Sequence, residues 1–258
     1  MSTEDSVHAD RGRAESFGSV AEQYDRYRPS YPDELISHLL ALNPEWTLDI
    51  ACGTGKVAVP LLACGLAVLG VEVDPQMAEV ARRHGIIVEL GAFETWDDDG
   101  RTFDLITCGQ GWHWIDPEQG PQKAARLLNP DGTLALLWNY GDLFGELKSD
   151  LDAVYGKLAP ALVPDARKQR HDDDGHVAAL KATGQFASVH TEKYGWSATL
   201  NAEEWVARLA THSDHITLPE DQRTALLTEV RKVIEAHGNN AELRGGTYVI
   251  FARVPEKK

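Results

Sequence analysis

The stretch LDIACGTGKV, from Leu48 to Val57, decides the fold of this chain. Apolar residues lead up to Asp49, and small residues and glycines then open a segment with a helical pattern. A strand that passes through a glycine turn into a helix presents backbone N–H groups to a nucleotide-bearing ligand. The stretch therefore predicts a nucleotide-binding α/β domain with an acidic side chain beside its ligand.

Strand and helix patterns alternate on both sides of this turn. Such alternation predicts a parallel sheet with helices on both faces. The apolar run TLALLW, which begins at Thr133, fits this arrangement, because the strands of a parallel sheet are buried on both sides. The expected strands cover residues 46–51, 67–73, 86–90, 103–109 and 133–139, and the expected helices between them cover residues 56–64, 75–84 and 121–128.

The alternation ends after Asn139. Helical patterns then cover residues 142–162, 174–184, 201–212 and 219–238, with strand patterns at 186–196 and 245–254. We therefore expect five segments along the chain. They are a flexible N-terminus (1–15), an N-terminal helical lid (16–44) that Ser16 begins, a ligand-binding core (45–140), a helical substrate cap with a sixth strand (141–240), and the final strand of the core with a tail (241–258).

Composition and charge limit the possible partners. The chain has 258 residues and a formal net charge of −15, which disfavours nucleic acid as a partner. Its three scattered cysteines indicate a reducing compartment, and no apolar run approaches the roughly 20 residues of a membrane helix. We expect a cytoplasmic protein that acts on a small molecule without a membrane or metal. The acidic run HDDDGH at 171–176 suits the first turn of a helix better than a metal site.

Two ligands are compatible with the glycine turn. Gly53, Gly55 and Ala58 satisfy the G-x-G-x-x-G/A fingerprint of dinucleotide binding, and Glu72 ends the next strand, where a carboxylate holds ribose hydroxyls. A pyrophosphate beside Asp49 would be repelled. S-adenosylmethionine (SAM) has no phosphate and carries a sulfonium and an ammonium group, so the same carboxylate attracts it. Alternatively, Asp49 caps the turn and touches no ligand.

Several segments together resemble the class I SAM-dependent methyltransferases, and most of all the small-molecule group called methyltransferase type 11. They are the core LDIACGTGKVAVPLLACGLAVLGVEVDPQMAEVAR together with FGSVAEQYDRYRPSYPDEL, FDLITCGQGWHWID and AARLLNPDGTLALLWN. The resemblance covers about residues 16–140. It implies a Rossmann-like, mainly parallel sheet of seven strands with an antiparallel last strand, helices on both faces and a helical cap. It also implies SAM as the cofactor and residues 45–140 as the SAM-binding core.

The resemblance assigns cofactor contacts residue by residue. The methionine part of SAM is expected beside Asp49, Ala51, Gly53 and Gly55, the ribose beside Glu72, and the adenine beside Val73, Met77 and Phe93, with a backbone contact from Gln110. The chain departs from the family pattern at two positions. Ala51 stands in place of the first glycine, and Ala92 in place of an aspartate that binds the adenine amino group, so Phe93, the backbone or Glu94 would have to serve there.

The acceptor side is expected to draw on two further segments. In GQGWHWID, His113 is the candidate proton acceptor, and Trp112 and Trp114 line the cofactor or acceptor site or pack in the core. In YDRYRPSYP, Tyr24, Arg28 and Tyr31 fold over the cleft, where Arg28 binds a carboxylate of cofactor or acceptor, or else forms a surface ion pair. Trp205, Leu209 and His212 share a helix face that packs in the core or lines the acceptor pocket.

The sequence thus predicts a SAM-dependent methyltransferase that methylates a small molecule, with oxygen as the preferred acceptor atom and carbon or nitrogen as alternatives. An NAD(P)-dependent oxidoreductase and a SAM-binding protein without turnover are the competing hypotheses. The oligomeric state and the identity of the acceptor stay open at this stage.

Overall fold

The computed structural model describes residues 15–163 and 173–256. Residues 1–14 of the expected flexible N-terminus and the first two residues of the HDDDGH run, His171 and Asp172, lie outside these residues. Within the described part, no helix is both long enough and apolar enough to cross a membrane.

Seven strands form one sheet in the order β3-β2-β1-β4-β5-β7-β6. All neighbouring strands are parallel except β7, which runs antiparallel to both β5 and β6. The predicted Rossmann-like, mainly parallel sheet is therefore confirmed. The strands are β1 (Trp46–Ile50), β2 (Ala67–Glu72), β3 (Ile87–Leu90), β4 (Phe103–Gly109), β5 (Leu128–Asp142), β6 (Ser188–Leu200) and β7 (Ala241–Arg253).

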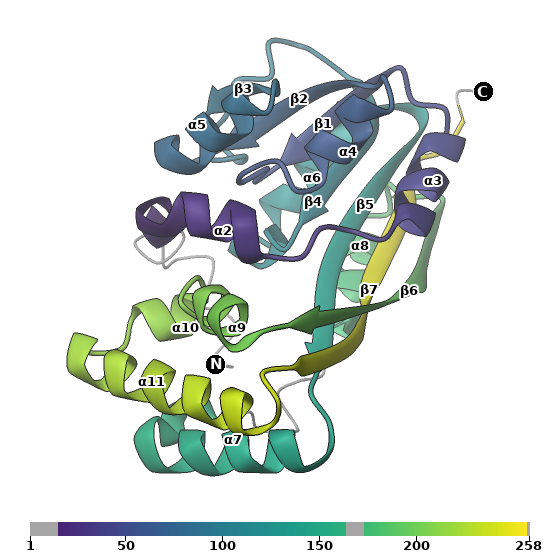
Figure 1. The fold of residues 1–258 in the computed structure, drawn as a ribbon. Coiled ribbons are helices and arrows are strands. Elements are labelled where there is room, and N and C mark those ends of the chain that lie inside the picture. The colour runs from purple at the N-terminus through teal and green to yellow at the C-terminus, as the bar shows by residue number, and fades with distance from the viewer. Residues whose placement is uncertain (1–14, 164–172, 257–258) are drawn as a thin grey trace.

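Helices cover both faces of the sheet, as predicted (Figure 1). One face packs against α3 (Asp33–Ala41), α4 (Ala58–Ala63) and α5 (Pro75–Arg83), and the other packs against α6 (Gln119–Leu127) and α8 (Asp173–Ala182). Strand β5 shows why both faces are apolar, because its alternate side chains enter opposite hydrophobic clusters. Leu134 and Leu136 belong to the cluster with α6, whereas Ala135 and Leu137 belong to the cluster with α3.

The glycine turn after β1 brings the chain back across the end of the strand. Ala51, Gly53 and Gly55 have φ values of 48°, 56° and 90°, which lie in the left-handed region. The Gly55 N–H donates to the Cys52 carbonyl at 2.8 Å and closes the turn. Because these residues are committed to the turn, α4 begins at Ala58, two residues later than the pattern predicts.

The N-terminal segment is a short 3₁₀ helix, η1 (Glu15–Val20), followed by α2 (Ala21–Tyr27), where the sequence predicts one helix. The Gly18 N–H donates to Asp74 Oδ2 at 2.9 Å, and a Cβ at Gly18 would lie 2.5 Å from that oxygen. This close approach fixes η1 against the start of α5. Arg28 ends α2 with extended backbone, as expected of a residue before a proline.

The cap lies beyond the carboxyl ends of the first strands, with α2 between it and the core (Figure 1). It consists of α7 (Gly145–Leu158), α9 (Ala202–Leu209), α10 (Ser213–Ile216) and α11 (Glu220–Ala236). Helices α7, α9 and α11 enclose a hydrophobic cluster of their own around Leu226, Val230 and Ile234. A short 3₁₀ helix, η3 (Pro160–Leu162), follows α7. Helix α8 lies within the expected cap segment but packs on the sheet through Leu180.

Candidate active site

Two cavities adjoin one another at the carboxyl ends of β1 and β4. Ligands of open α/β sheets bind at this end of the strands. The first cavity extends past Glu72 and Phe93, and the second extends past Asp49 towards the cap. The residues that line both are Tyr24, Arg28, Ala51, Gly53, Gly109 and Gln110.

Most residues predicted to contact the cofactor line the first cavity. Asp49 lines the second cavity instead, and Gly55 lines neither of the two. Gly55 lies deeper in the turn, where an added Cβ would meet Val59 Cγ2 at 3.1 Å, so it shapes the turn rather than the cavity wall. The predicted residues that line the first cavity are Ala51, Gly53, Glu72, Val73, Met77, Phe93 and Gln110.

Glu72 is a fixed, buried acceptor at the end of β2. Its Oε2 accepts the Gly53 N–H at 2.8 Å, and its Oε1 accepts the N–H groups of Val73 and Asp74, both at 2.9 Å. Burial raises the pKa of Glu72 above its usual value, and these three N–H bonds oppose that shift. The bonds hold the carboxylate in one orientation, and its remaining lone pairs can accept hydrogen bonds from two neighbouring hydroxyls.

Asp49 is fully enclosed between β1 and the glycine turn, at 1% exposure. Its Oδ1 accepts the Thr107 hydroxyl at 2.7 Å, whereas Oδ2 has no hydrogen-bond partner within the described residues. Burial and the nearby Glu72 raise the pKa of Asp49 to about 7, although the Thr107 hydroxyl and the backbone N–H of Ala58 lower it. A buried carboxylate oxygen without a donor is costly unless a ligand supplies a donor or a positive charge.

The rest of the first cavity wall is mainly apolar. Met77 and Phe93 are 5% and 2% exposed and lie with Val73 and Ala92 along the wall. Gln110 completes the wall with a φ of 59°, held by its N–H on the Leu137 carbonyl at 2.8 Å and its side-chain amide on the Asn139 carbonyl at 3.0 Å. A flat apolar group with a polar edge fits such a wall.

The residues predicted for the acceptor are distributed over three places. Tyr24 and Arg28 lie where the two cavities meet, and Tyr31 lines the second cavity. Trp114 lines the first cavity with His113, whose ring centroid lies 4.8 Å from that of Trp114.

Trp112 does not reach either cavity, contrary to its predicted acceptor contact. The short 3₁₀ helix η2 (Trp112–Trp114) turns this ring inwards, so it is 3% exposed and belongs to the hydrophobic cluster beneath β4. Trp112 therefore packs in the core, which was the alternative interpretation.

The second cavity has a basic and aromatic lining that spans the core, α2 and the cap. His212 belongs to it, while Leu209 and Trp205 pack in the cap cluster. Sequence reasoning missed most of this lining, because helical periodicity alone does not distinguish a cavity wall from a core face. Residues that were not assigned to the site are Lys56, Asn139, Tyr140, Asp142, Phe144, Arg208 and Arg244, together with Thr107, the partner of Asp49.

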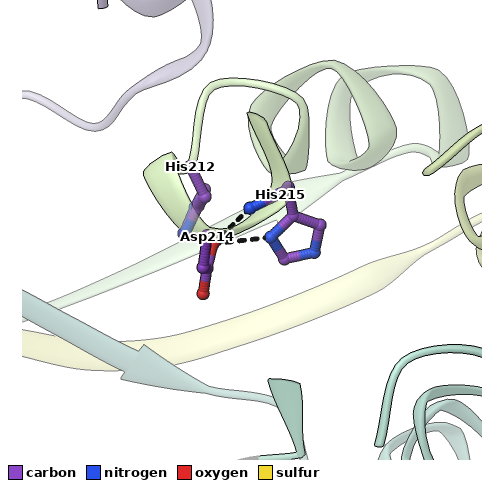
Figure 2. A group of neighbouring side chains, drawn as sticks. All are labelled: His212, Asp214 and His215. Atoms are coloured by element: carbon purple, nitrogen blue, oxygen red, sulfur yellow. Dashed lines mark hydrogen bonds and ion pairs between the residues drawn. The ribbon is translucent and has the colours of Figure 1, made fainter. Parts of the chain in front are cut away.

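Three polar side chains gather at the start of α10, beside this cavity (Figure 2). His212, Asp214 and His215 have potential ligand atoms within 4.8 Å of one another. However, Asp214 Oδ1 lies 2.7 Å from His215 Nδ1, and the Tyr155 hydroxyl lies 2.8 Å from His215 Nε2, so both nitrogens of His215 have partners. The arrangement is an aspartate–histidine–tyrosine network that fixes α10 on α7.

The comparisons with known proteins agree with this geometry. Residues 47–132 match the family described as a methyltransferase domain. The chain is 31% identical over 232 residues to an uncharacterized methyltransferase of Mycobacterium tuberculosis, and the match covers 89% of this chain and 90% of that protein.

Solved structures show the same fold at low sequence identity. One is a candidate type II methyltransferase from Anaeromyxobacter dehalogenans, with a TM-score of 0.68, 17% identity, and coverage of 90% of this chain and 100% of that chain. Another is the phosphoethanolamine N-methyltransferase 2 of Haemonchus contortus, in complex with phosphomonomethylethanolamine and S-adenosylhomocysteine. Its TM-score is 0.51 at 15% identity, with coverage of 93% of this chain and 58% of that chain.

One assignment follows from the sheet order, from the two cavities at the carboxyl ends of the strands, and from the identity to a methyltransferase over nearly the whole of both chains. This chain belongs to the class I methyltransferases.

Proposed function

We propose that this protein transfers a methyl group from SAM to a small-molecule acceptor. The observation that carries the proposal is the enclosed Asp49 carboxylate, whose Oδ2 has no partner within the described residues and which lines the second cavity next to the glycine turn. A ligand with a positively charged end compensates this carboxylate, and SAM carries a sulfonium and an α-ammonium. A dinucleotide would bring a pyrophosphate to the same place, where the carboxylate repels it.

The residues present fit SAM along its whole length. Asp49, Ala51 and Gly53 would hold the methionine end and Glu72 the ribose hydroxyls. The adenine would lie against Val73, Met77 and Phe93. That the Haemonchus contortus enzyme of the same fold is described with S-adenosylhomocysteine supports the choice of this cofactor.

When bound, SAM supplies an electrophilic methyl group on a sulfonium. The protein aligns the reaction and excludes water, because methyl transfer is an in-line displacement that depends on orientation. Tyr24 and Arg28 stand where the two cavities meet, so they are placed to fix the two reactants relative to each other. We take oxygen as the preferred acceptor atom, because each cavity contains a histidine that can accept a hydroxyl proton.

Two other features belong to the proposal. The three cysteines of the chain are free thiols, which supports a reducing compartment such as the cytoplasm. The net charge of −15 supports a small molecule rather than nucleic acid as the acceptor.

Calorimetric titration with SAM and with NADH separates the proposal from its main competitor. We expect SAM to bind and NADH not to bind, and the opposite result would establish an oxidoreductase. Incubation with methyl-labelled SAM and a metabolite extract then tests turnover by mass spectrometry. Tight binding of SAM with no labelled product from any extract would indicate a SAM-binding protein without turnover.

A further inference from the structure

Two arginines from distant parts of the chain meet in the wall of the second cavity. Arg28 follows α2, and Arg208 lies in the last turn of α9 in the cap. Arg28 is oriented by Thr211, because its Nε donates to the Thr211 hydroxyl at 2.9 Å and its Nη2 to the Thr211 carbonyl at 3.0 Å. Arg208 packs over the Trp205 ring, with Cζ at 5.6 Å from the ring centroid.

These two guanidinium groups have no carboxylate in direct contact within the described residues, and the nearest compensation is the electrostatic effect of Asp214 on Arg28. Neither forms an ion pair with a carboxylate of residues 15–163 or 173–256. Burial lowers the pKa of Arg28, and burial together with the nearby Arg28 lowers the pKa of Arg208 to about 10. Because a guanidinium group stays protonated at neutral pH, both arginines are cationic and repel each other.

The other cations of the cavity differ in this respect. Lys56 Nζ lies 3.9 Å from Asp25 Oδ1, and Arg244 Nη2 lies 2.7 Å from Glu242 Oε1. Asp49 and Asp142 also line this cavity, but neither carboxylate lies within ion-pair distance of the two arginines. The unneutralised positive charge of the cavity is thus concentrated on Arg28 and Arg208.

The arrangement also argues against a metal at the neighbouring His212–Asp214–His215 network. Arg28 and Arg208 both act electrostatically on His212 and lower its pKa, so a second cation there would meet the same repulsion. His212 Nε2 is buried without a partner within the described residues. A neutral imidazole beside two guanidinium groups suits an anionic ligand. Such a ligand compensates the positive charge of the arginines and forms a hydrogen bond with the imidazole.

We propose that Arg28 and Arg208 form an anion subsite in the second cavity, so that the methyl acceptor is a small molecule with a carboxylate or phosphate group. The proposal rests on the proposed function for the role of the ligand as acceptor, but the anion subsite itself does not depend on methyl transfer. Tyr31, Tyr140 and Phe144 line the same cavity, and they provide aromatic contacts for the body of such a molecule.

Binding of aromatic anions tests the subsite directly. Benzoate and phenyl phosphate are titrated into the full-length protein by calorimetry, and benzamide serves as the uncharged analogue. We expect one of the anions to bind and benzamide not to bind. In Arg208→Gln and Arg28→Gln the affinity for that anion should fall by about tenfold or more, the scale of a lost charge-assisted bond. Whether benzoate or phenyl phosphate binds more tightly distinguishes a carboxylate from a phosphate.

Two controls keep the result specific. Arg231→Gln on α11 removes the same charge outside both cavities and should leave anion affinity within about twofold. Thermal unfolding shows whether each variant is folded, and Arg208→Lys, which keeps the charge, should retain part of the affinity even if Arg208→Gln is unstable.

Three binding results would overturn the proposal. In the first, benzamide binds as tightly as the anions. In the second, a folded Arg208→Gln variant keeps the anion affinity of the wild type. In the third, the wild type binds neither anion, and Arg208→Gln loses affinity for SAM. The last would assign the arginines to the carboxylate of the cofactor. If an anion binds as expected but SAM does not, the proposed function fails while the anion subsite stands. If the labelled product shows that the acceptor molecule carries no negative charge, an anionic acceptor is excluded.

Discussion

Asp49 and Thr107 are direct register partners on the parallel strands β1 and β4, and the Thr107 hydroxyl donates to Asp49 Oδ1 at 2.7 Å. Both residues are fully buried where the two strands approach the cavities. The bond orients the carboxylate and leaves Oδ2 without a partner among the described residues. The buried negative charge of Asp49 lowers the stability of the free protein, and a cationic ligand would compensate it.

The first prediction concerns SAM affinity and pH. Burial raises the pKa of Asp49 to about 7 in the free protein, and a bound cation favours the ionised carboxylate. Binding below that pH must therefore release a proton, so SAM affinity should fall by up to about tenfold per pH unit between about pH 7 and 5.5. Calorimetry in buffers of different ionisation enthalpy measures both the affinity and the released proton.

Asp49→Asn should bind SAM more weakly by roughly 1–3 kcal/mol at pH 8, the scale of a lost charge-assisted partner, and should lose the pH dependence. S-adenosylhomocysteine, which lacks the sulfonium charge, serves as the control ligand and should be less affected by the substitution. An identical pH profile in wild type and Asp49→Asn would show that another group is responsible.

The second prediction concerns stability. A carboxyl whose pKa is raised in the folded state binds more protons there than in the unfolded chain, so stability decreases as pH rises through the interval from about 4 to 7. Between pH 5 and 8, wild type should lose about 2–3 kcal/mol of unfolding free energy relative to Asp49→Asn. Urea unfolding of both proteins at the two pH values gives the difference, in which the titration of all other groups cancels. If the difference in unfolding free energy between wild type and Asp49→Asn is the same at pH 5 and pH 8, the pKa of Asp49 is not raised.

The third prediction concerns the attachment of the N-terminal segment. Asp74 Oδ1 caps α5 by accepting the N–H groups of Gln76 and Met77 at 2.8 and 3.1 Å, and Oδ2 accepts the Gly18 N–H. Asp74→Ala should cost about 2–3 kcal/mol, the sum of a lost cap and an unpartnered buried N–H. Chemical denaturation measures the loss.

Asp74→Asn separates the two effects. Asparagine caps a helix as well as aspartate does, but its amide nitrogen cannot accept the Gly18 N–H. We therefore expect nearly full stability of α5 with faster proteolysis of the segment around Gly18, and weaker SAM binding because Phe17 lines the first cavity. Unchanged proteolysis would show that the Gly18 contact does not anchor η1.

The core of the site was predictable because its residues lie within one strand–turn–helix unit and the strands beside it. The spacing of Asp49, Gly53 and Glu72 follows from that local geometry, and so does the position of the first cavity. The start of α4 was two residues off, because the left-handed residues Ala51, Gly53 and Gly55 extend the turn beyond what an apolar pattern reveals.

The second cavity was not predictable in the same way. Arg28 and Thr211 are 183 residues apart in sequence, and they meet only because α9 packs on α2. The extension of β5 to Asp142 was missed for a similar reason. Tyr140 and Gly141 show no strand pattern, and they pair with β7 because Gly245 and Gly246 let the two backbones approach closely. Tertiary packing, not local propensity, forms this side of the site.

The fourth prediction distinguishes the two histidines as proton acceptors. His113 lines the first cavity beside Trp114, whereas His212 lines the second cavity with a buried Nε2 that has no partner in the described part of the chain. Burial and the adjacent Arg28 hold the pKa of His212 well below its usual value, so the ring is neutral at physiological pH and can accept a hydrogen bond from a hydroxyl of the acceptor. His212→Gln should therefore lower kcat by about tenfold to a hundredfold with little effect on the KM for SAM. His113→Gln should mainly raise that KM, because its ring lies in the cofactor cavity.

Steady-state kinetics on the labelled acceptor measure both, with thermal unfolding as the check on folding. A kcat that falls in His113→Gln and not in His212→Gln would make His113 the base, and an unchanged kcat in both would mean that the acceptor reacts without a histidine base.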